Sequence, residues 1–96
     1  MKIQKAAVIG AGTMGAGIAQ VLSQAGIEVI LKDIAQDMLD RGLANIRRMY
    51  DSRVKKEILT QAEADFLIAN VKLSTTYDGF KDVDLVIEAA LETVRY

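Results

Sequence analysis

Three glycines near the start of the chain have a spacing suited to binding a phosphate group. Gly10, Gly12 and Gly15 form the pattern G-x-G-x-x-G. The first glycine permits a tight turn, the second lets the backbone approach a diphosphate, and the third lets a helix pack close to a strand. A helix beginning here would also direct unpaired N–H groups and its positive dipole end at the phosphates. The candidate diphosphate-binding residues are Gly10, Ala11, Gly12, Thr13, Met14 and Gly15.

A carboxylate later in the chain completes this pattern. Asp33 follows the apolar run at residues 27–32 and lies 18 positions after Gly15. This is close to the separation of about 20 residues at which an acid accepts hydrogen bonds from an adenosine ribose. We expect NAD rather than NADP, because Asp33 would repel a 2′-phosphate and position 34 is Ile rather than Arg. The neighbouring Lys32 is expected on the opposite face of its strand.

The glycines and the aspartate must lie at the ends of adjacent strands. Residues 3–9 and 27–32 are apolar and β-branched, which predicts two strands. Residues 14–25 between them have helical periodicity, and Gly26 is the expected C-cap. The expected packed face of this helix consists of Met14, Ile18, Val21, Leu22 and Ala25.

A long helix is predicted over residues 36–55. Its apolar stripe consists of Leu39, Leu43, Ile46, Tyr50 and Val54. Its other surface is basic and consists of Arg41, Arg47, Arg48, Arg53, Lys55 and Lys56. Two interpretations stay open, a solvated helix face or a surface that attracts the phosphates of a second ligand.

A second helix and two further strands follow. Thr60 and Glu63 form a capping box that starts a helix ending near residue 69, with Ala62 and Phe66 expected to face inward. The two helices form a hairpin within one crossover. Residues 71–75 alternate in polarity like a strand near a sheet edge, and residues 83–92 predict a strand buried on both faces.

Right-handed crossovers then predict an α/β fold, a Rossmann-type parallel sheet with strand order 3-2-1-4 and a helical hairpin insert. This is a truncated sheet, one strand beyond the first mononucleotide half. The switch point lies between the first and fourth strands, so a ligand should sit over Gly10 and Ala89. Residues 88–92 form the second lip of that crevice. The chain is expected to be a single partial domain over residues 1–96.

Composition excludes several classes of function. The chain has 12 basic and 13 acidic residues and a net charge of −1, so no global charge favours nucleic acid or an anionic membrane. It has no cysteine or histidine, so we expect no disulfide, no thiolate chemistry and no metal site. No signal pattern or long apolar run is present, and a cytoplasmic location is the default expectation.

Three segments resemble the NAD-binding part of the 3-hydroxyacyl-CoA dehydrogenases: residues 8–21, 29–34 and 77–92. The sequences LKDI at 31–34 and YDGF at 77–80 look most like the dehydrogenase portion of multifunctional fatty-acid β-oxidation proteins. The resemblance implies oxidation of an L-3-hydroxyacyl-CoA to the 3-ketoacyl-CoA, with hydride passing to NAD. The partners it implies are NAD(H) and, in a full-length parent, an acyl-CoA.

The resemblance also implies roles for particular residues. The glycine segment would bind the pyrophosphate, with Met14 as a backbone and packing neighbour, and Asp33 would hold the adenosine ribose. Lys56 would match a lysine that contacts CoA, although Met49 stands where the family has a serine. The nicotinamide side of the crevice would be lined by Ala90, Leu91 and Glu92.

No catalytic residue is expected in this chain. The family's catalytic histidine, the glutamate that orients it and the helical C-terminal domain all follow the stretch present here, and the sequence contains no histidine. Glu88 and Glu92 are expected to have cofactor or structural roles. We therefore expect cofactor binding without turnover by these residues alone.

Two other functions remain open, a stand-alone nucleotide-binding or regulatory module, and another NAD-dependent dehydrogenase of the 6-phosphogluconate or prephenate type. The outer edge of the fourth strand, at Leu85, Val86 and Ile87, predicts self-association through unpaired backbone groups.

Overall fold

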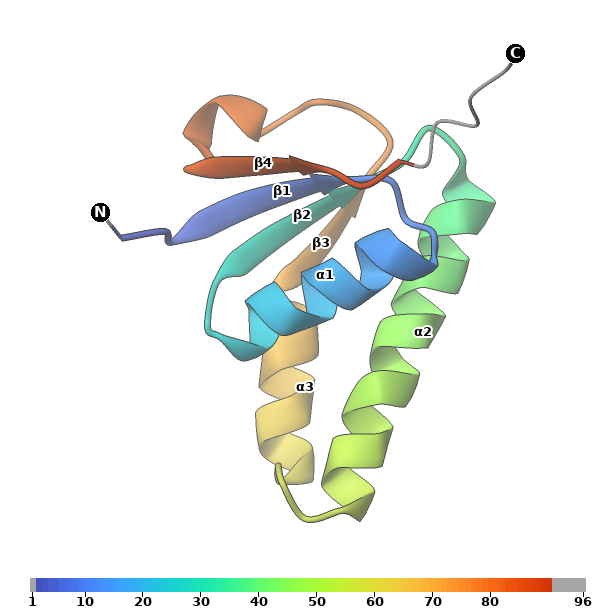
Figure 1. Ribbon diagram of the computed structural model, residues 1–96, viewed down its shortest axis with the longest axis vertical. Helices are drawn as coiled ribbons and strands as arrows, with labels where there is room; N and C mark the ends of the chain where they lie inside the picture. The colour runs from blue at the N-terminus through green and yellow to red at the C-terminus, as the bar shows by residue number, and fades with distance from the viewer. Residues whose placement is uncertain (1, 91–96) are drawn as a thin grey trace.

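The computed structural model describes residues 2–90, which form one parallel sheet and three α-helices (Figure 1). The elements in chain order are β1 (Lys5–Ile9), α1 (Thr13–Gln24), β2 (Glu28–Lys32), α2 (Gln36–Lys55), α3 (Gln61–Ala69), β3 (Val71–Ser74), the 3-10 turn η1 (Phe80–Asp82) and β4 (Leu85–Glu88).

The sheet has the predicted topology. Its strand order is β3-β2-β1-β4, and every pairing is parallel. In the centre of the sheet Val8 of β1 is in register with Leu31 of β2 and Ile87 of β4. β2 and β3 are added on one side of β1, whereas β4 is added on the other side. The carboxyl ends of β1 and β4 therefore flank the switch point of the sheet.

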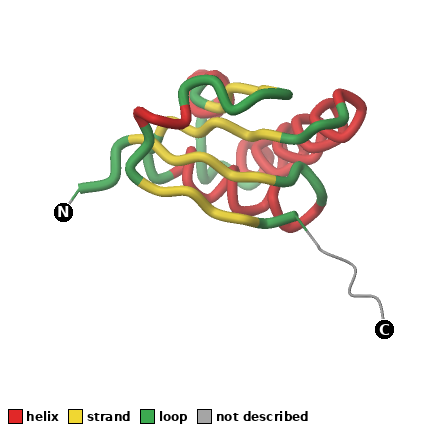
Figure 2. The backbone as a smooth tube through the Cα atoms, turned by 90° about the horizontal axis from the view of Figure 1, so that it is seen from above, coloured by secondary structure: helices red, strands yellow, loops and turns green. Residues whose placement is uncertain are grey.

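The two faces of the sheet are covered differently. All three helices lie on one face (Figures 1 and 2), where Val8, Val29 and Leu31 pack with Leu39, Ile46 and Tyr50 in the core. The β3–β4 connection lies against the other face, where Gly79 approaches the side chain of Ile30. Side chains of β2 are therefore buried on both faces, as its continuous apolar run requires.

The packed face of α1 differs from the prediction. Its buried residues are Gly15, Ala16, Ala19, Gln20 and Ser23, whereas Met14 is 49% exposed and Val21 is 63% exposed. The larger apolar residues lie on the outer side because this helix approaches the strands too closely for bulky side chains. Only Ile18 and Leu22 of the predicted face pack partly against the core.

A buried polar cluster joins α1 to α2. The hydroxyl groups of Ser23 and Tyr50 are hydrogen bonded to each other, and both lie within hydrogen-bonding distance of the carbonyl oxygen of Gln20. Since each hydroxyl has a single proton, one of them donates to the other, which in turn donates to Gln20. Tyr50 is completely buried, and this burial raises the pKa of its phenol above 10.0. The cluster fixes where the two helices cross, because buried hydroxyl groups must keep their partners.

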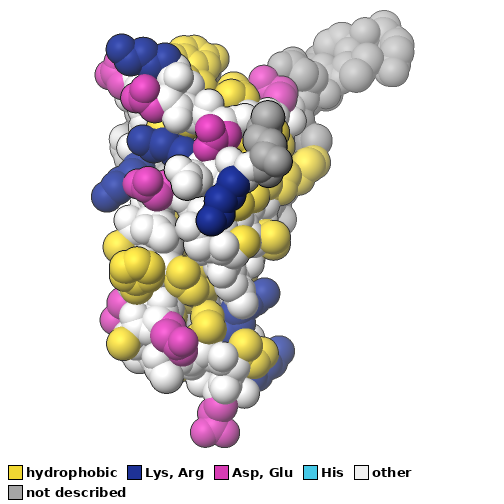
Figure 3. All heavy atoms as spheres, turned by 90° about the vertical axis from the view of Figure 1, so that its left-hand side faces the viewer, with side chains coloured by type: hydrophobic (Ala, Val, Ile, Leu, Met, Phe, Trp, Pro, Cys, Tyr) yellow, Lys and Arg dark blue, Asp and Glu magenta, His cyan; other side chains and the backbone are white. Residues whose placement is uncertain are grey.

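The helical hairpin forms as predicted, with one difference in the phase of α3. Thr60 accepts a hydrogen bond from the Glu63 N–H, and Glu63 accepts one from the Thr60 N–H, which completes the capping box. Ala64 and Ile68, one helical turn apart, face the core instead of Ala62 and Phe66. Phe66 is 68% exposed, and hydrophobic side chains are visible over this end of the molecule (Figure 3).

β4 was predicted to be buried on both faces, and this prediction is wrong for the residues described. It lies at the edge of the sheet formed by residues 2–90, and Val86 is 48% exposed while Leu85 and Ile87 are half-buried. The sequence at residues 85–87 of β4 is continuously apolar because residues facing the helices and residues facing away from them are both apolar, although only some of them are half-buried. Within residues 2–90, no helix has both the length and the apolar character needed to cross a bilayer.

Candidate functional site

The turn after β1 depends on a glycine at position 10. Gly10 has a φ of +103°, which side chains disfavour, and its N–H donates to the carbonyl oxygen of Lys32 at 2.7 Å. A Cβ at this position would lie 2.6 Å from the backbone nitrogen of Ala90. The turn therefore brings the ends of β1, β2 and β4 together around a residue that has no side chain.

Gly12 and Gly15 have different surroundings. A Cβ on Gly15 would lie 1.7 Å from the carbonyl oxygen of Gly10, so α1 can approach β1 this closely only with glycine there. A Cβ on Gly12 would meet nothing closer than the Met38 methyl carbon at 4.0 Å. The backbone at Gly12 thus faces open space, which is the arrangement that a backbone-bound diphosphate needs.

The first turn of α1 presents free donors to the same space. Gly12 is the N-cap, and the first helical hydrogen bond runs from the Ala16 N–H to the Gly12 carbonyl oxygen at 2.9 Å. Among residues 2–90, no side chain caps this end of α1, and no acidic residue lies in its first turn. The N–H groups of residues 13–15 and the positive end of the helix dipole remain available to an anion.

Asp33 connects two loops of the site. Its Oδ2 accepts a hydrogen bond from the Ala11 N–H at 3.0 Å, and its Oδ1 accepts one from the Ala35 N–H at 3.1 Å. The half-buried carboxylate therefore holds the glycine turn against the start of α2. Each oxygen keeps a second acceptor position that a ribose hydroxyl can use.

Two adjoining cavities lie over these strand ends. The first has a volume of about 370 Å³ and is lined by Gly10, Gly12, Thr13, Met14, Asp33, Met38, Ala89 and Ala90. The second has a volume of about 250 Å³ and is lined by Ile9, Gly10, Lys32, Asp33, Ile34, Tyr77, Glu88 and Ala90. They share Gly10, Asp33 and Ala90, and together they form a crevice at the switch point, where open α/β sheets bind ligands.

Most of the predicted residues meet in this crevice. The glycine turn, Asp33 and Ala90 converge there, while the predicted Leu91 and Glu92 lie outside the described residues. Lys32 does point to the opposite sheet face, but it lines the second cavity beside Asp33. Alternation along β2 places Lys32 there, and Lys32 was not among the residues predicted for the site.

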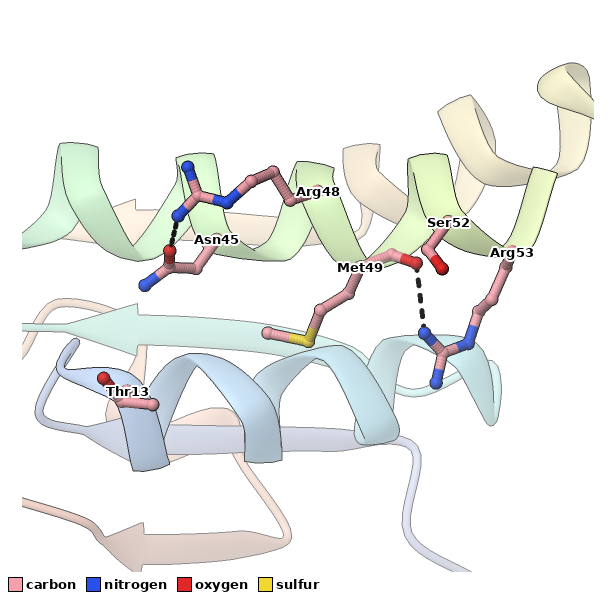
Figure 4. A pocket seen from close by; sticks show the side chains of 6 residues that line it. All are labelled: Thr13, Asn45, Arg48, Met49, Ser52 and Arg53. Atoms are coloured by element: carbon pink, nitrogen blue, oxygen red, sulfur yellow. Dashed lines mark hydrogen bonds between the residues drawn. The ribbon is translucent and has the colours of Figure 1, made fainter. Parts of the chain in front are cut away.

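A separate groove lies between α2 and the first turn of α1. It has a volume of about 470 Å³ and is lined by Thr13, Asn45, Arg48, Met49, Ser52 and Arg53 (Figure 4). Arg53 donates to the Met49 carbonyl oxygen at 3.0 Å, and Arg48 donates to the Asn45 side chain. Two guanidinium groups and two hydroxyl groups thus border one solvent-open groove.

The groove contains some, but not all, of the basic residues for which a solvated helix face and a phosphate-attracting surface were both considered. Arg48 and Arg53 line it, whereas Lys56 follows α2 as its exposed C-cap and is absent from the lining. Asn45 and Ser52 were not predicted as site residues. Their positions relative to Arg48 and Met49 follow the i, i+3, i+4, i+7 spacing, which places all four on one face of a helix.

Several known proteins are similar to this chain in sequence and in fold. The family model for the NAD-binding domain of 3-hydroxyacyl-CoA dehydrogenase matches residues 5–96. The chain is 39% identical over 93 residues to the peroxisomal fatty acid beta-oxidation multifunctional protein MFP2 of Arabidopsis thaliana, covering 97% of this chain and 13% of that protein. It is 41% identical over 92 residues to the fatty acid oxidation complex subunit alpha of Shewanella baltica, covering 95% of this chain and 13% of that protein.

A solved structure agrees with the fold. The (S)-3-hydroxybutyryl-CoA dehydrogenase PaaH1 from Ralstonia eutropha superposes with a TM-score of 0.90 and is 41% identical. That match covers 97% of this chain and 33% of the other. The chain therefore spans a small part of the length of the proteins it matches.

Proposed function

This chain belongs to the family of the NAD-binding domain of 3-hydroxyacyl-CoA dehydrogenases, and from this premise we propose how its residues bind NAD(H). The diphosphate lies over Gly12 and accepts hydrogen bonds from the free N–H groups in the first turn of α1. The observation that carries this proposal is the open space in front of Gly12, since a Cβ there would project toward the crevice. Thr13 and Met14 border the same space.

Asp33 holds the adenosine ribose in this proposal. Its carboxylate is oriented by the N–H groups of Ala11 and Ala35, so it needs no rearrangement to accept the ribose hydroxyls. The family is NAD-binding, which agrees with the repulsion that Asp33 would exert on a 2′-phosphate. We assign Ala90, Leu91 and Glu92 to the nicotinamide side of the crevice.

The second ligand is proposed to be the CoA portion of an acyl-CoA. The groove with Arg48 and Arg53 has the cations and hydroxyl groups that bind phosphate, and it begins at Thr13, beside the dinucleotide crevice. Lys56 lies one turn beyond Arg53, so we assign it to the outer end of the same surface. This arrangement favours a phosphate-binding role over a purely solvated helix face.

The wider function proposed is oxidation of an L-3-hydroxyacyl-CoA within a longer dehydrogenase. Removing the hydroxyl proton as hydride leaves requires an acid–base group within hydrogen-bonding reach. The 96 residues contain no histidine, so we propose that they bind cofactor but do not turn over substrate on their own. Family membership argues against the alternative dehydrogenases of the 6-phosphogluconate and prephenate types.

Calorimetry with NAD and NADH, together with an NADH-linked assay using a 3-ketoacyl-CoA, tests these statements separately. We expect saturable heat with both nucleotides and no turnover above background. Absence of nucleotide binding would contradict the proposed function. Turnover by the isolated chain would contradict only the proposal that it is inactive alone.

Two further proposals concern partners and location. β4 is the edge strand of the sheet formed by residues 2–90, and its outer edge there offers unpaired backbone groups to a second copy, so we propose self-association. Sedimentation at high concentration should detect a dimer, and a monomer would contradict this. A cytoplasmic location also remains a proposal, to be tested by fractionation.

A further inference from the structure

The outer face of α3 has an apolar stripe that the proposed function does not use. Ala62, Phe66 and Ala69 follow the i, i+4, i+7 spacing, which places them on one side of the helix. All three are exposed, and the Phe66 side chain is 68% exposed. The core of residues 2–90 takes Ala64 and Ile68 from α3 instead. The stripe is therefore an apolar helix face that this domain leaves in solvent.

A groove beside the stripe extends this apolar surface toward the end of α1. The groove, called the α3 groove below, has a volume of about 470 Å³ and is lined by Gln24, Leu59, Ala62, Glu63, Phe66 and Leu67. Leu59 and Leu67 pack against the core, so their positions are fixed. Ile58 precedes Leu59 in the hairpin bend and is 60% exposed. A contiguous exposed apolar patch with polar residues at its rim is typical of an interaction site.

The rim of the α3 groove is acidic. Residues 57–71 contain three acidic residues and no basic residue. Glu63 lines the groove, and Asp65 lies on the other side of the Phe66 stripe, because successive residues of a helix are about 100° apart around its axis. Figure 3 shows acidic side chains among the hydrophobic ones at this end of the molecule. The apolar stripe is thus flanked by a carboxylate on each side.

Both carboxylates are oriented by hydrogen bonds within the hairpin. Oε1 of Glu63 accepts the Thr60 N–H at 2.8 Å, and Oδ1 of Asp65 accepts the Gln61 side-chain amide at 2.9 Å. The second oxygen of each carboxylate can accept a hydrogen bond from a lysine or arginine side chain. The α3 groove therefore combines an aromatic anchor with two positioned anions.

We propose that the α3 groove binds an amphipathic basic helix of a protein partner. The apolar side chains of that helix cover Phe66, and its lysine or arginine side chains pair with Glu63 and Asp65. Docking an amphipathic helix into an apolar groove is a recurring mode of recognition, with anchor residues three or four positions apart. Charge complementarity favours a basic partner and disfavours an acidic one.

Two other occupants fit the α3 groove less well. An anionic membrane surface would be repelled by the two carboxylates. A second copy of this chain could present the basic residues of α2, but Ala44 is the single apolar residue among the exposed positions of that helix. Such a surface has no large side chain with which to cover Phe66.

The α3 groove lies away from the dinucleotide crevice. Gln24, the last residue of α1, lines the groove, whereas Thr13, the first residue of α1, lines the crevice. The rise of a helix places these two residues about 17 Å apart. A helix bound in the groove would leave the crevice open, so this inference goes beyond the proposed function and is tested separately from it.

The test measures binding of a labelled synthetic helix by fluorescence anisotropy. The peptide has about 14 residues, or roughly four turns, with leucine at every third or fourth position and lysine elsewhere. We expect saturable binding of this peptide, and binding at least about tenfold weaker when glutamate replaces every lysine. Phe66→Ser should weaken the lysine peptide at least about tenfold, because the aromatic anchor is lost. Glu63→Gln together with Asp65→Asn should weaken it about three- to tenfold at low salt, and less at high salt.

Matched controls change residues of similar exposure outside the α3 groove. Val21→Ser replaces an apolar residue of α1 that is 63% exposed, and Glu28→Gln together with Asp51→Asn removes two exposed carboxylates elsewhere. Both controls should keep the affinity for the lysine peptide, and Phe66→Ser should keep the affinity for NAD.

Several results would overturn this inference while leaving NAD binding intact. One is equal affinity for the lysine and glutamate peptides, and another is unchanged affinity for the lysine peptide in Phe66→Ser. Binding to phosphatidylglycerol vesicles that Phe66→Ser abolishes would identify a membrane as the occupant instead. Self-association that Phe66→Ser abolishes, measured by sedimentation, would identify a second copy.

Discussion

Alanine substitutions at three glycines at or in α1 would place the added methyl group in three different environments. Gly12 precedes the helix, Gly15 faces β1 and Gly17 lies on the outer side. Replacing each with alanine separates close packing, ligand access and helix propensity. All three variants can be measured by urea denaturation and by calorimetry with NAD.

The distances determine the expected stability of two of these variants. A Cβ on Gly15 would lie 1.7 Å from the Gly10 carbonyl oxygen, whereas ordinary contact is about 3.5–4 Å, so the helix must move by about 2 Å. Overpacking of this kind costs about 1–3 kcal/mol and sometimes more. Because backbone lies on both sides of the contact, we expect Gly15→Ala to lose about 3 kcal/mol or more. A Cβ on Gly17 has nothing within 4 Å, so Gly17→Ala should gain about 0.5–1 kcal/mol from helix propensity.

Gly12→Ala should separate binding from stability. Its added methyl meets only the Met38 methyl carbon at 4.0 Å, so the free energy of unfolding should stay within about 1 kcal/mol, the difference between these residues at an N-cap. NAD affinity should fall at least about tenfold, because the methyl occupies the approach of the diphosphate to the backbone. Unchanged NAD affinity in Gly12→Ala would refute the proposed position of the diphosphate. Equal stability of Gly15→Ala and Gly17→Ala would refute the close contact of α1 with β1.

Three further predictions concern charges and hydroxyl groups. Asp33→Ala should lower the free energy of unfolding by about 1.5–3 kcal/mol without ligand, because two charge-assisted hydrogen bonds to backbone N–H groups are lost. The same change should weaken NAD binding in calorimetry. The exposed control Asp51→Ala should change neither quantity by more than about 0.5 kcal/mol. Because the pKa of Tyr50 is raised in the folded state, its contribution to stability is fully present below pH 10.0 and is lost as pH rises through the pKa of the folded state. Urea denaturation from about pH 8 to about pH 11 should show this loss in the original chain and not in Tyr50→Phe. Parallel pH dependences of stability for the two proteins would contradict this prediction. Arg53→Gln should weaken CoA binding several-fold in calorimetry at low salt, whereas Arg47→Gln, which changes an exposed residue outside the groove, should not; equal losses would indicate a diffuse charge effect.

Local spacing was sufficient to predict the strand order and the convergence of the glycine turn with Asp33. The turn at Gly10, the helix after it and the carboxylate at Asp33 lie within one βαβ unit, where short-range geometry leaves few alternatives. The capping box at Thr60 was predictable for the same reason, since both of its hydrogen bonds lie within four residues. These features depend on residue type and separation rather than on distant packing.

Periodicity predicted the packed face of α2, where Leu39, Ile46 and Tyr50 are buried, but not the packed faces of α1 and α3. In α1 and α3 it identified residues that share a face, but the structure packs a different face of each helix against the core. In α1 the close approach at Gly15 requires small neighbours, so Ala16 and Ala19 are buried and Val21 is exposed. A hydrophobicity pattern alone does not contain that steric requirement.

What the sequence by itself determined is the glycine turn, the helix that begins there and the aspartate one strand away, because these follow from bonded geometry over short separations. Only the tertiary structure decided that Arg48 and Arg53 meet Thr13 in a groove and that Lys32 faces Glu88 across Ile9. Those groups are far apart in the chain, and they come together through the register of parallel strands and the crossing of α1 with α2. Register and crossing depend on how backbones pack against one another, which no single segment of sequence specifies.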